Sequence, residues 1–295
     1  MPSYPFETVD VFTDRRFGGN QLAVFTDARG LSDAQMQALA AEMNYSETTF
    51  VLPPDDPANT ARVRIFHRTA EMPFAGHPNV GTACVLAAHG RDSDGLLLFE
   101  ELAGLVEVRV ARDADGLVTG ATIAAPQALS LGIQLPADAI AACAGLGPQH
   151  VLTGRHPPQQ ASLGVKFVLA EVAPEALARA TPDIAAYRRL AQANPGLEGR
   201  LSIFFYAWVG GTVRARMFAP LAGTWEDPAT GSASATLAAL TLSLSDRDSL
   251  AFEIAQGVEM GRPSLLQVTA RRVGAEIRAT VGGGCVPVLK GEATV

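Results

Sequence analysis

The amino-acid sequence predicts an α+β fold built as two lobes of similar construction. Three observations favour this fold. Short strand-like segments outnumber helices, the helices are too widely spaced for an unbroken series of strand–helix–strand units, and a motif of the first half recurs in the second. We place the N-terminal lobe at residues 1–127 and the C-terminal lobe at residues 128–295, with the last strand a candidate to return to the N-terminal lobe.

The first half alternates predicted strands with two predicted helices. Ser32 is expected to begin a helix over 33–43, because apolar residues recur there at helical spacing. A second helix is expected over 78–89, and the Pro- and Gly-rich segment 125–135 is the best candidate for a linker. The predicted strands are 7–12, 21–25, 48–52, 61–66, 96–99, 106–110 and 117–123.

The second half is predicted to repeat much of this order. A helix is expected over most of 174–194, and another begins near Gly231. The predicted strands are 164–169, 201–208, 212–218, 250–254, 265–270 and 276–281.

The recurring motif is centred on Gly76 in the first half and on Gly231 in the second. In both copies Glu stands five residues before the glycine, Pro three before and Ala seven after. Each copy follows an Arg-x-Phe strand end and precedes a Phe-Glu pair with Gly five residues beyond the Phe; these are Arg64–Phe66 and Phe99/Gly104, then Arg216–Phe218 and Phe252/Gly257. Three matches in the same order indicate two related lobes.

Composition excludes several classes of protein. The net charge of −7 and pI of about 5.3 argue against a nucleic-acid partner, which selects for basic patches. The three cysteines (Cys84, Cys143 and Cys285) have neither the number of a disulfide framework nor the spacing of a zinc site, which favours a reducing, cytoplasmic location. We expect no signal peptide and no membrane span, because no segment has the required apolar length.

Each motif copy places its glycine where a strand gives way to a helix. A helix start exposes unpaired backbone N–H groups and the positive end of the helix dipole, and glycine lets a ligand approach them closely. Gly76 and Gly231 are therefore candidates to bind a carboxylate. The competing interpretation is that both merely make turns, with Ser232 as an N-cap.

Three ionisable residues are further candidates, and each has an ordinary interpretation as well. His77 opens the predicted helix and could titrate near neutrality, or it could simply cap or pack. Asp227 precedes Pro228, which is also a standard turn signal. Glu47 lies where a helix gives way to a strand, a position typical of surface glutamates.

Five ordered motifs resemble the PhzF-like family, named for a phenazine-biosynthesis isomerase with the diaminopimelate epimerase fold. They span nearly the whole chain: Val9–Thr13 with Phe17–Asn20, Asn44–Phe50, Phe74–Pro78, Glu226–Ala233, and Gln256-Gly257 with Gly261–Ser264. The chain departs from the usual family pattern at His67-Arg68, where many relatives have Thr-Pro, and at Gln21, where Pro is more usual. Neither change touches the proposed catalytic set, although His67 and Arg68 could reshape the rim of the pocket.

The resemblance implies two pseudo-symmetric lobes, each a curled, mostly antiparallel sheet around a central helix, with the active site between them. It implies a homodimer without a cofactor or metal. Residue by residue, it implies that Glu47 is the proton shuttle, that His77, Asp227 and Ser232 contact the substrate, and that Gly76 and Gly231 lend backbone N–H groups.

The predicted activity is isomerisation by proton transfer within a small cyclic or dihydro-aromatic amino or hydroxy acid, in secondary-metabolite biosynthesis. Glu47, His77 and Asp227 form the predicted catalytic set, and Gly76, Gly231 and Ser232 the substrate-binding set. One alternative is an epimerase of the same fold, but such enzymes use one cysteine in each lobe, and these helix starts carry none. Another is a non-catalytic protein that binds small acids, which the intact set of polar residues disfavours.

Overall fold

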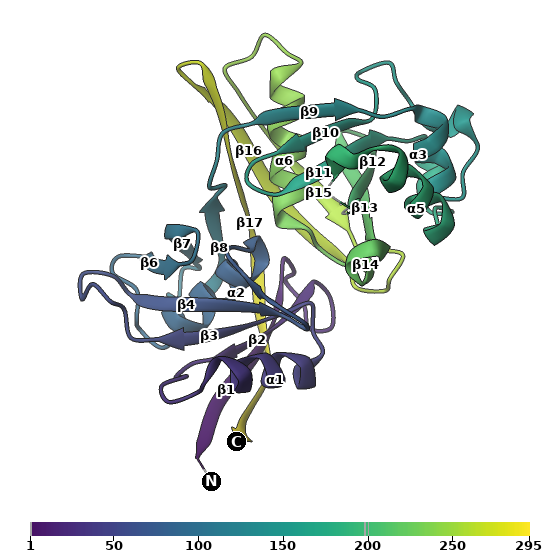
Figure 1. Ribbon diagram of the computed structural model, residues 1–295. Coiled ribbons are helices and arrows are strands. Elements are labelled where there is room, and N and C mark those ends of the chain that lie inside the picture. The colour runs from purple at the N-terminus through teal and green to yellow at the C-terminus, as the bar shows by residue number, and fades with distance from the viewer. Residues whose placement is uncertain (1, 198, 200) are drawn as a thin grey trace. The chain divides into compact units, whose positions relative to one another are not determined.

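The computed structural model describes residues 2–197, 199 and 201–295, and the chain divides into two compact units (Figure 1). Unit 1 comprises the residues up to Pro126 together with Val281–Val295, and unit 2 comprises Gln127–Thr280. The last strand, β17 (Glu276–Thr294), begins in unit 2 and ends in unit 1, where it pairs with β1 (Ser3–Val11).

Unit 1 is a sheet that closes on itself. Its remaining elements are β2 (Asn20–Phe25), α1 (Asp33–Met43), β3 (Glu47–Leu52), β4 (Ala61–His67), β5 (Glu71–Met72), α2 (Gly76–Ala88), β6 (Leu96–Glu101), β7 (Gly104–Arg112) and β8 (Val118–Ala124). Pairing runs in the order β17–β1–β2–β3–β4–β6–β7–β8, and β8 pairs in turn with β17. Only β2–β3 and β4–β6 are parallel among these pairs of described strands, as expected where a helix connects the two strands.

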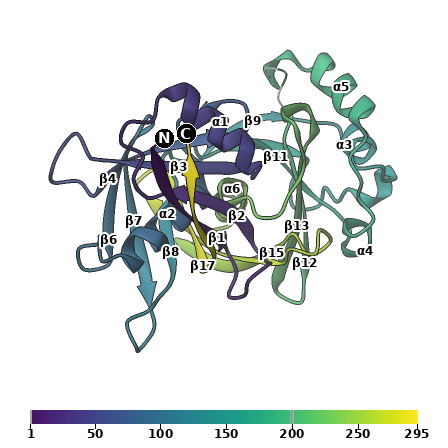
Figure 2. The same cartoon turned by 90° about the horizontal axis from the view of Figure 1, so that it is seen from below.

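Helix α2 is the core of unit 1, surrounded by the strands (Figure 2). All its residues except Ala88 are buried, so it is apolar on every side, as a helix enclosed by a sheet must be. Gly81 permits this packing, since a Cβ atom there would lie 2.6 Å from Leu22 Cδ2. Helix α1 covers the outer face instead, where Met36 and Ala40 pack against a cluster that includes Phe25, Phe50 and Phe66.

Unit 2 has the same order of connections. Its helices are α3 (Ala137–Cys143), α4 (Pro174–Leu177), α5 (Ile184–Ala193) and α6 (Gly231–Ser243), with 3-10 turns at Pro148–His150, Pro195–Leu197 and Pro220–Ala222. Its strands are β9 (Ser130–Gln134), β10 (Gln159–Ser162), β11 (Lys166–Glu171), β12 (Ile203–Val209), β13 (Thr212–Ala219), β14 (Thr224–Asp227), β15 (Ser249–Gln256) and β16 (Ser264–Val273).

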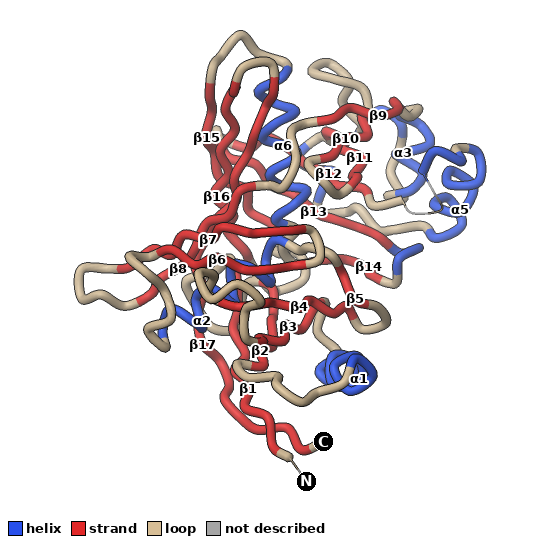
Figure 3. The backbone as a smooth tube through the Cα atoms, turned by 60° about the vertical axis from the view of Figure 1, so that its left-hand side comes forward, coloured by secondary structure: helices blue, strands red, loops and turns tan. Residues whose placement is uncertain are grey.

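In each unit the two parallel strand pairs are joined by one outer and one central helical connection. In unit 2 the parallel pairs are β11–β12, joined through α4 and α5, and β13–β15, joined through the buried helix α6. Strands predominate over helices in both units, which Figure 3 shows by colour. The α+β prediction, with a central helix within a curled sheet in each half, is confirmed.

The repeated motif is also a repeated set of contacts. In unit 1, Arg64 donates from Nε and Nη2 to the two carboxyl oxygens of Glu71, at 2.7 and 2.6 Å, and its guanidinium lies 5.1 Å from the centre of the Phe66 ring. In unit 2, Arg216 donates to Glu226 in the same way, at 2.8 and 2.8 Å, and lies 4.9 Å from the ring centre of Phe218. The residues that precede the two central helices are therefore equivalent by geometry as well as by spacing.

Two local predictions need correction. The helix expected over most of 174–194 is two helices. Helix α4 ends at Leu177, Pro182 disfavours a helical residue before it, and Asp183 begins α5 by accepting a hydrogen bond from the Ala186 N–H. The segment 125–135, expected to be a linker, contains strand β9, which pairs with β10.

Candidate functional site

In unit 1 the predicted residues meet at the start of helix α2. Ala75, the residue before the helix, is extended and provides no side-chain cap. The first backbone N–H groups of α2 therefore lack the partner that a Ser, Thr, Asn or Asp cap would supply. Gly76 and His77 open the helix, and both are buried.

Glu47 reaches this helix start from the first residue of β3. Its Oε2 lies 3.5 Å from His77 Nε2, and the two side chains are only 14% and 6% exposed. Two residues further along β3, the Thr49 hydroxyl shares a 2.8 Å hydrogen bond with the Thr82 hydroxyl, which connects β3 to α2. The structure thus brings Glu47 and His77 together, and Glu47 is not the freely exposed surface residue that its local sequence could equally have indicated.

His77 carries no charge at neutral pH. Burial lowers its pKa to about 3, although a hydrogen bond to the backbone of Gln21 acts in the opposite direction. Asn20 Nδ2 lies 3.5 Å from His77 Nδ1, and the Asn20 side-chain oxygen accepts a hydrogen bond from Ser46. His77 is therefore a neutral imidazole whose Nε2 lies beside the Glu47 carboxylate.

A second histidine lies beside Glu47. His67 is the direct partner of Glu47 across the antiparallel β3–β4 pair, so both side chains lie on the same face of the sheet. Burial and the neighbouring Arg68 lower the pKa of His67. The sequence marks His67 as a departure at the rim of the pocket, but its pairing with Glu47 is not visible in a local motif.

In unit 2 the predicted residues gather at the start of helix α6. Thr230 precedes the helix and provides no side-chain cap among the described residues, and Gly231 is buried. Ser232 lies within the first turn and is only partly buried. The interpretation of Ser232 as an N-cap is therefore wrong, and its hydroxyl is not used to cap α6.

Asp227 is held by a small hydrogen-bond network. The Thr230 hydroxyl donates to Asp227 Oδ2 at 2.6 Å, and Gln256 Nε2 donates to the Asp227 carbonyl at 2.7 Å and to Thr230 Oγ1 at 2.9 Å. Gln256 Oε1 accepts from the Thr230 backbone N–H at 3.0 Å. The amide of Gln256, fully buried, thus fixes the segment that precedes α6.

The backbone at Gly257 explains why a glycine follows Gln256 in the motif. Gly257 has a φ of +72°, and a Cβ there would lie 2.4 Å from the Arg262 carbonyl oxygen and 2.5 Å from that of Pro228. A side chain would therefore push the loop after β15 away from the segment that carries Asp227.

We call Glu47, Gly76 and His77 the unit 1 site, and Asp227, Gly231 and Ser232 the unit 2 site. Each set is brought together within its own unit. The sequence motifs contain Thr230 and Gln256 but assign a role to neither. Of these, Gln256 could have been found, since it stands as far after Gly231 as Glu101 stands after Gly76.

The cysteines are not arranged as one thiol per unit. Cys84 on α2 and Cys285 on β17 are neighbours in unit 1, where burial and their mutual hydrogen bond raise the pKa of Cys285. Cys143 is buried alone in unit 2 at the end of α3, and burial raises its pKa to about 12. None of the three belongs to the unit 1 or unit 2 site, which argues against thiol-based epimerisation.

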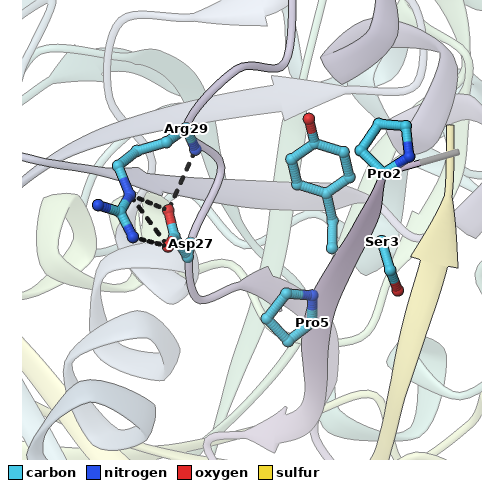
Figure 4. Close-up of a pocket in the computed structure, with 6 residues that line it drawn as sticks. Pro2, Ser3, Pro5, Asp27 and Arg29 are labelled. Atoms are coloured by element: carbon cyan, nitrogen blue, oxygen red, sulfur yellow. Dashed lines mark hydrogen bonds and ion pairs between the residues drawn. The ribbon is translucent and has the colours of Figure 1, made fainter.

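No cluster of His, Cys, Asp or Glu among the described residues could hold a metal ion. A surface pocket is lined by Pro2, Ser3, Tyr4, Pro5, Asp27 and Arg29, and Figure 4 shows that its arginine is bound to its aspartate. That pocket contains none of the predicted site residues.

The family model for phenazine biosynthesis-like proteins matches residues 9–291. The chain belongs to this PhzF-like family. An uncharacterised isomerase of Mesorhizobium japonicum is 38% identical over 96% of both chains. The trans-2,3-dihydro-3-hydroxyanthranilate isomerase of Pseudomonas aeruginosa is 35% identical over 98% of both. The PhzF-like chain is, like these relatives, an isomerase.

Solved structures agree on the fold. A PhzF-family protein of Bacillus anthracis matches with a TM-score of 0.88, covering 100% of both chains at 23% identity. A hydroxyproline epimerase of Agrobacterium vitis matches with a TM-score of 0.64 over 98% of this chain and 92% of its own, at 14% identity. The PhzF-like chain therefore has the epimerase-like fold. No helix in the described ranges is long and apolar enough to cross a membrane.

Proposed function

We propose that this PhzF-like protein moves a proton within a small cyclic acid, using Glu47 as the group that removes and returns it. The observation that carries the proposal is the Glu47–His77 pair, a carboxylate 3.5 Å from a neutral imidazole at an uncapped helix start. The proposed substrate class is a dihydro-aromatic amino or hydroxy acid, following the trans-2,3-dihydro-3-hydroxyanthranilate named for the Pseudomonas relative.

In the proposed reaction the Glu47 carboxylate takes a proton from a ring carbon as that C–H bond breaks. The electron pair shifts through the adjoining double bond, and protonated Glu47 returns its proton to another carbon of the same molecule. Atoms and charge balance without an oxidant, reductant or second substrate, which supports the expectation of a cofactor-independent enzyme. Positioned proton transfer of this kind contributes about 10²–10⁴-fold in rate.

The helix starts supply the electrostatics of the proposal. The uncapped N–H groups at Gly76 and Gly231, with the Ser232 hydroxyl, are proposed to bind the substrate carboxylate and the charge that develops on proton removal. Asp227 is proposed to contact a polar substituent of the same substrate. Its support is the network from Thr230 and Gln256, which fixes its position before any ligand arrives.

We propose further that the protein is a cytoplasmic homodimer, as the family resemblance implies. Its three buried free thiols are compatible with a reducing compartment. Light scattering of the purified protein would give a dimer mass, and a monomer mass at working concentration would contradict this.

The experiment that tests the function uses Glu47→Gln, which keeps size and hydrogen bonding but cannot carry a proton. With trans-2,3-dihydro-3-hydroxyanthranilate as the probe, named for the relative, turnover should fall about 10²–10⁴-fold while the probe still binds. The matched control is Glu42→Gln, an exposed glutamate on α1. Equal turnover in the two variants would show that Glu47 does not transfer the proton.

A further inference from the structure

Glu101, the last residue of β6, has a carboxyl group whose environment does not suit a charge. Both of its oxygens are buried, and neither has a hydrogen-bond partner of ordinary geometry, although the Asn79 side chain lies close enough to favour the ionised form. The Asn79 side-chain oxygen is likewise buried without a partner. Unpartnered buried polar atoms are rare in native proteins, so two neighbouring groups of this kind need a common explanation.

Strand register identifies the counterpart of Glu101 in unit 2. The Arg–Glu–Phe contacts make Arg64 equivalent to Arg216, and therefore Ala61 equivalent to Val213. Phe99 pairs with Ala61, and Ile254 pairs with Val213, both in parallel. Two residues further along these strands stand Glu101 and Gln256.

This equivalence corrects the alignment that the sequence motif gave, which matched Phe99 with Phe252. It also shows what the position does, because Gln256 is the residue that fixes the segment ahead of α6. A glutamic acid that keeps its proton has the shape of glutamine and the same ability to donate one hydrogen bond and accept another. An ionised glutamate can only accept.

We propose that Glu101 is a positioning residue that acts as a neutral acid, donating a hydrogen bond to the Asn79 side-chain oxygen and thereby fixing the start of helix α2. The inference rests on the proposed function, since it gives a role in that reaction to the segment that carries Gly76 and His77. It adds a residue that contacts neither the proton nor the substrate.

From Asn79, a hydrogen bond continues to the residue before helix α2. Asn79 Nδ2 donates to the Ala75 carbonyl at 3.0 Å, so the orientation of this amide is set and its oxygen faces away from Ala75. In the turn after Glu101, the Ala103 N–H donates to the Pro73 carbonyl at 3.1 Å. The proton on Glu101 completes a line from β6 through Asn79 to the residue immediately before Gly76.

The charges around Glu101 agree with a neutral acid. Burial raises the pKa of Glu101 to about 8. The nearby guanidinium groups on β4 are already engaged by other carboxylates, and within the described residues no ion pair joins either of them to Glu101. Arg62 (with Asp55), Arg64 (with Asp33 and Glu71) and Glu100 are the charged groups that line one surface pocket with Glu101.

The sign of the pH effect follows from this raised pKa. The folded state holds the Glu101 proton up to about pH 8, whereas the unfolded chain releases it near the ordinary value of 4.5. The contribution of protonated Glu101 to the free energy of unfolding is therefore complete below pH 4.5 and is lost as the pH rises towards 8. Above that pH Glu101 ionises, and the line to Ala75 loses its donor.

The test compares Glu101→Gln and Glu101→Leu in the full-length protein. Glu100→Gln is the matched control, because that neighbouring carboxylate is only partly buried and accepts hydrogen bonds from Asn59 and from the N–H groups of Asp55 and Asp56. Infrared difference spectra of wild type minus Glu101→Gln should show a protonated carboxyl band at pH 7 that disappears around pH 8. The control pair should show no such band.

Activity supplies the second measurement. Wild type should lose kcat/KM above about pH 8, Glu101→Gln should keep its activity there, and Glu101→Leu should have a lowered kcat at every pH. An ionised Glu101 at pH 7, or an alkaline loss that persists unchanged in Glu101→Gln, would overturn the proposal. The infrared measurement needs no turnover, so it remains decisive even if Glu47→Gln shows that the proposed function is wrong.

Discussion

The starts of helices α2 and α6 are built alike but equipped differently. Both follow a strand fixed by an Arg–Glu pair over a phenylalanine, both begin with a buried glycine, and neither has a side-chain cap in the described chain. In unit 1 the ionisable groups Glu47, His77 and Glu101 lie around the start of α2. In unit 2 the one ionisable group of the site, Asp227, is fixed by the amide of Gln256 and the hydroxyl of Thr230, which do not ionise.

In the proposed function, this difference separates proton transfer at the start of α2 from anion binding at the start of α6. A proton shuttle needs ionisable groups in a buried setting, where their pKa values are easily displaced. An anion-binding site needs donors whose state does not change with pH. Two copies of one scaffold can carry different side chains. A change in pH should therefore alter the charge state of the unit 1 site and leave the hydrogen bonds around Asp227 in unit 2 unchanged.

The largest expected effect concerns the shared Arg–Glu pair. Arg216 and Glu226 are each 9% exposed, whereas Arg64 and Glu71 are 14% and 23% exposed. Arg216 also donates to the carbonyls of Leu177 and Ala180. Arg216→Ala should therefore cost about 3–5 kcal/mol of unfolding free energy, because it leaves a buried charge unpaired. Denaturant titration should give a clearly smaller loss for Arg64→Ala, and equal losses would refute the comparison.

The second prediction isolates His77. Its folded pKa of about 3 lies below its ordinary value of 6.5, so the unfolded chain binds a proton that the folded chain does not. Stability should fall as the pH drops below 6.5, with a contribution of about 1.4 kcal/mol per pH unit. His77→Gln should remove that part of the slope. His89→Gln, a change of an exposed histidine that contacts Glu7, is the control, and identical slopes in the two variants would contradict a neutral His77.

A third prediction concerns unit 2, whose hydrogen bonds should not change with pH. Thr230→Val removes the hydroxyl that donates to Asp227 and accepts from Gln256, and should cost about 1–3 kcal/mol. Substrate turnover should fall without any change in its pH profile. Thr241→Val, which removes a hydroxyl bonded to the Leu237 carbonyl within α6, is the control. A displaced pH profile in Thr230→Val would show that unit 2 also sets the proton chemistry.

The smallest expected effect is that of thiol modification. All three cysteines are buried, and the Cys84–Cys285 pair lies wholly within unit 1. Brief alkylation of the native protein should leave activity unchanged, and Cys84→Ser should be active. Rapid inactivation that substrate prevents would instead favour the two-thiol epimerase mechanism.

Local signals predicted the elements that depend on local chemistry. Helix α1 begins and ends where expected, because Ser32 and Gln35 form a reciprocal capping box at its start and Asn44 adopts the left-handed conformation at its end. Pro182 was an equally local signal, and it divides α4 from α5. Strand β10 could not be predicted this way, because its residues Gln159–Ser162 are polar and become a buried strand only through pairing with β11 and β9.

The candidate site followed the same rule. The glycines at the helix starts are marked by their motif, so Gly76 and Gly231 could be singled out. The closeness of His67 to Glu47, and of Glu101 to Asn79, could not be predicted, since each depends on a strand partner or a helix neighbour distant in sequence. The motif even suggested a wrong alignment for β6 and β15, because matching letters are a weaker guide than strand register.

The central claim is that unit 1 transfers the proton and unit 2 does not. The direct measurement is solvent-deuterium incorporation into the product, compared between Glu47→Gln and Asp227→Asn in D2O. Asp227→Asn should react slowly, through impaired orientation, yet its product should contain deuterium as in wild type. Glu47→Gln should give neither product nor labelled substrate. Normal incorporation in Glu47→Gln, with none in Asp227→Asn, would contradict the account.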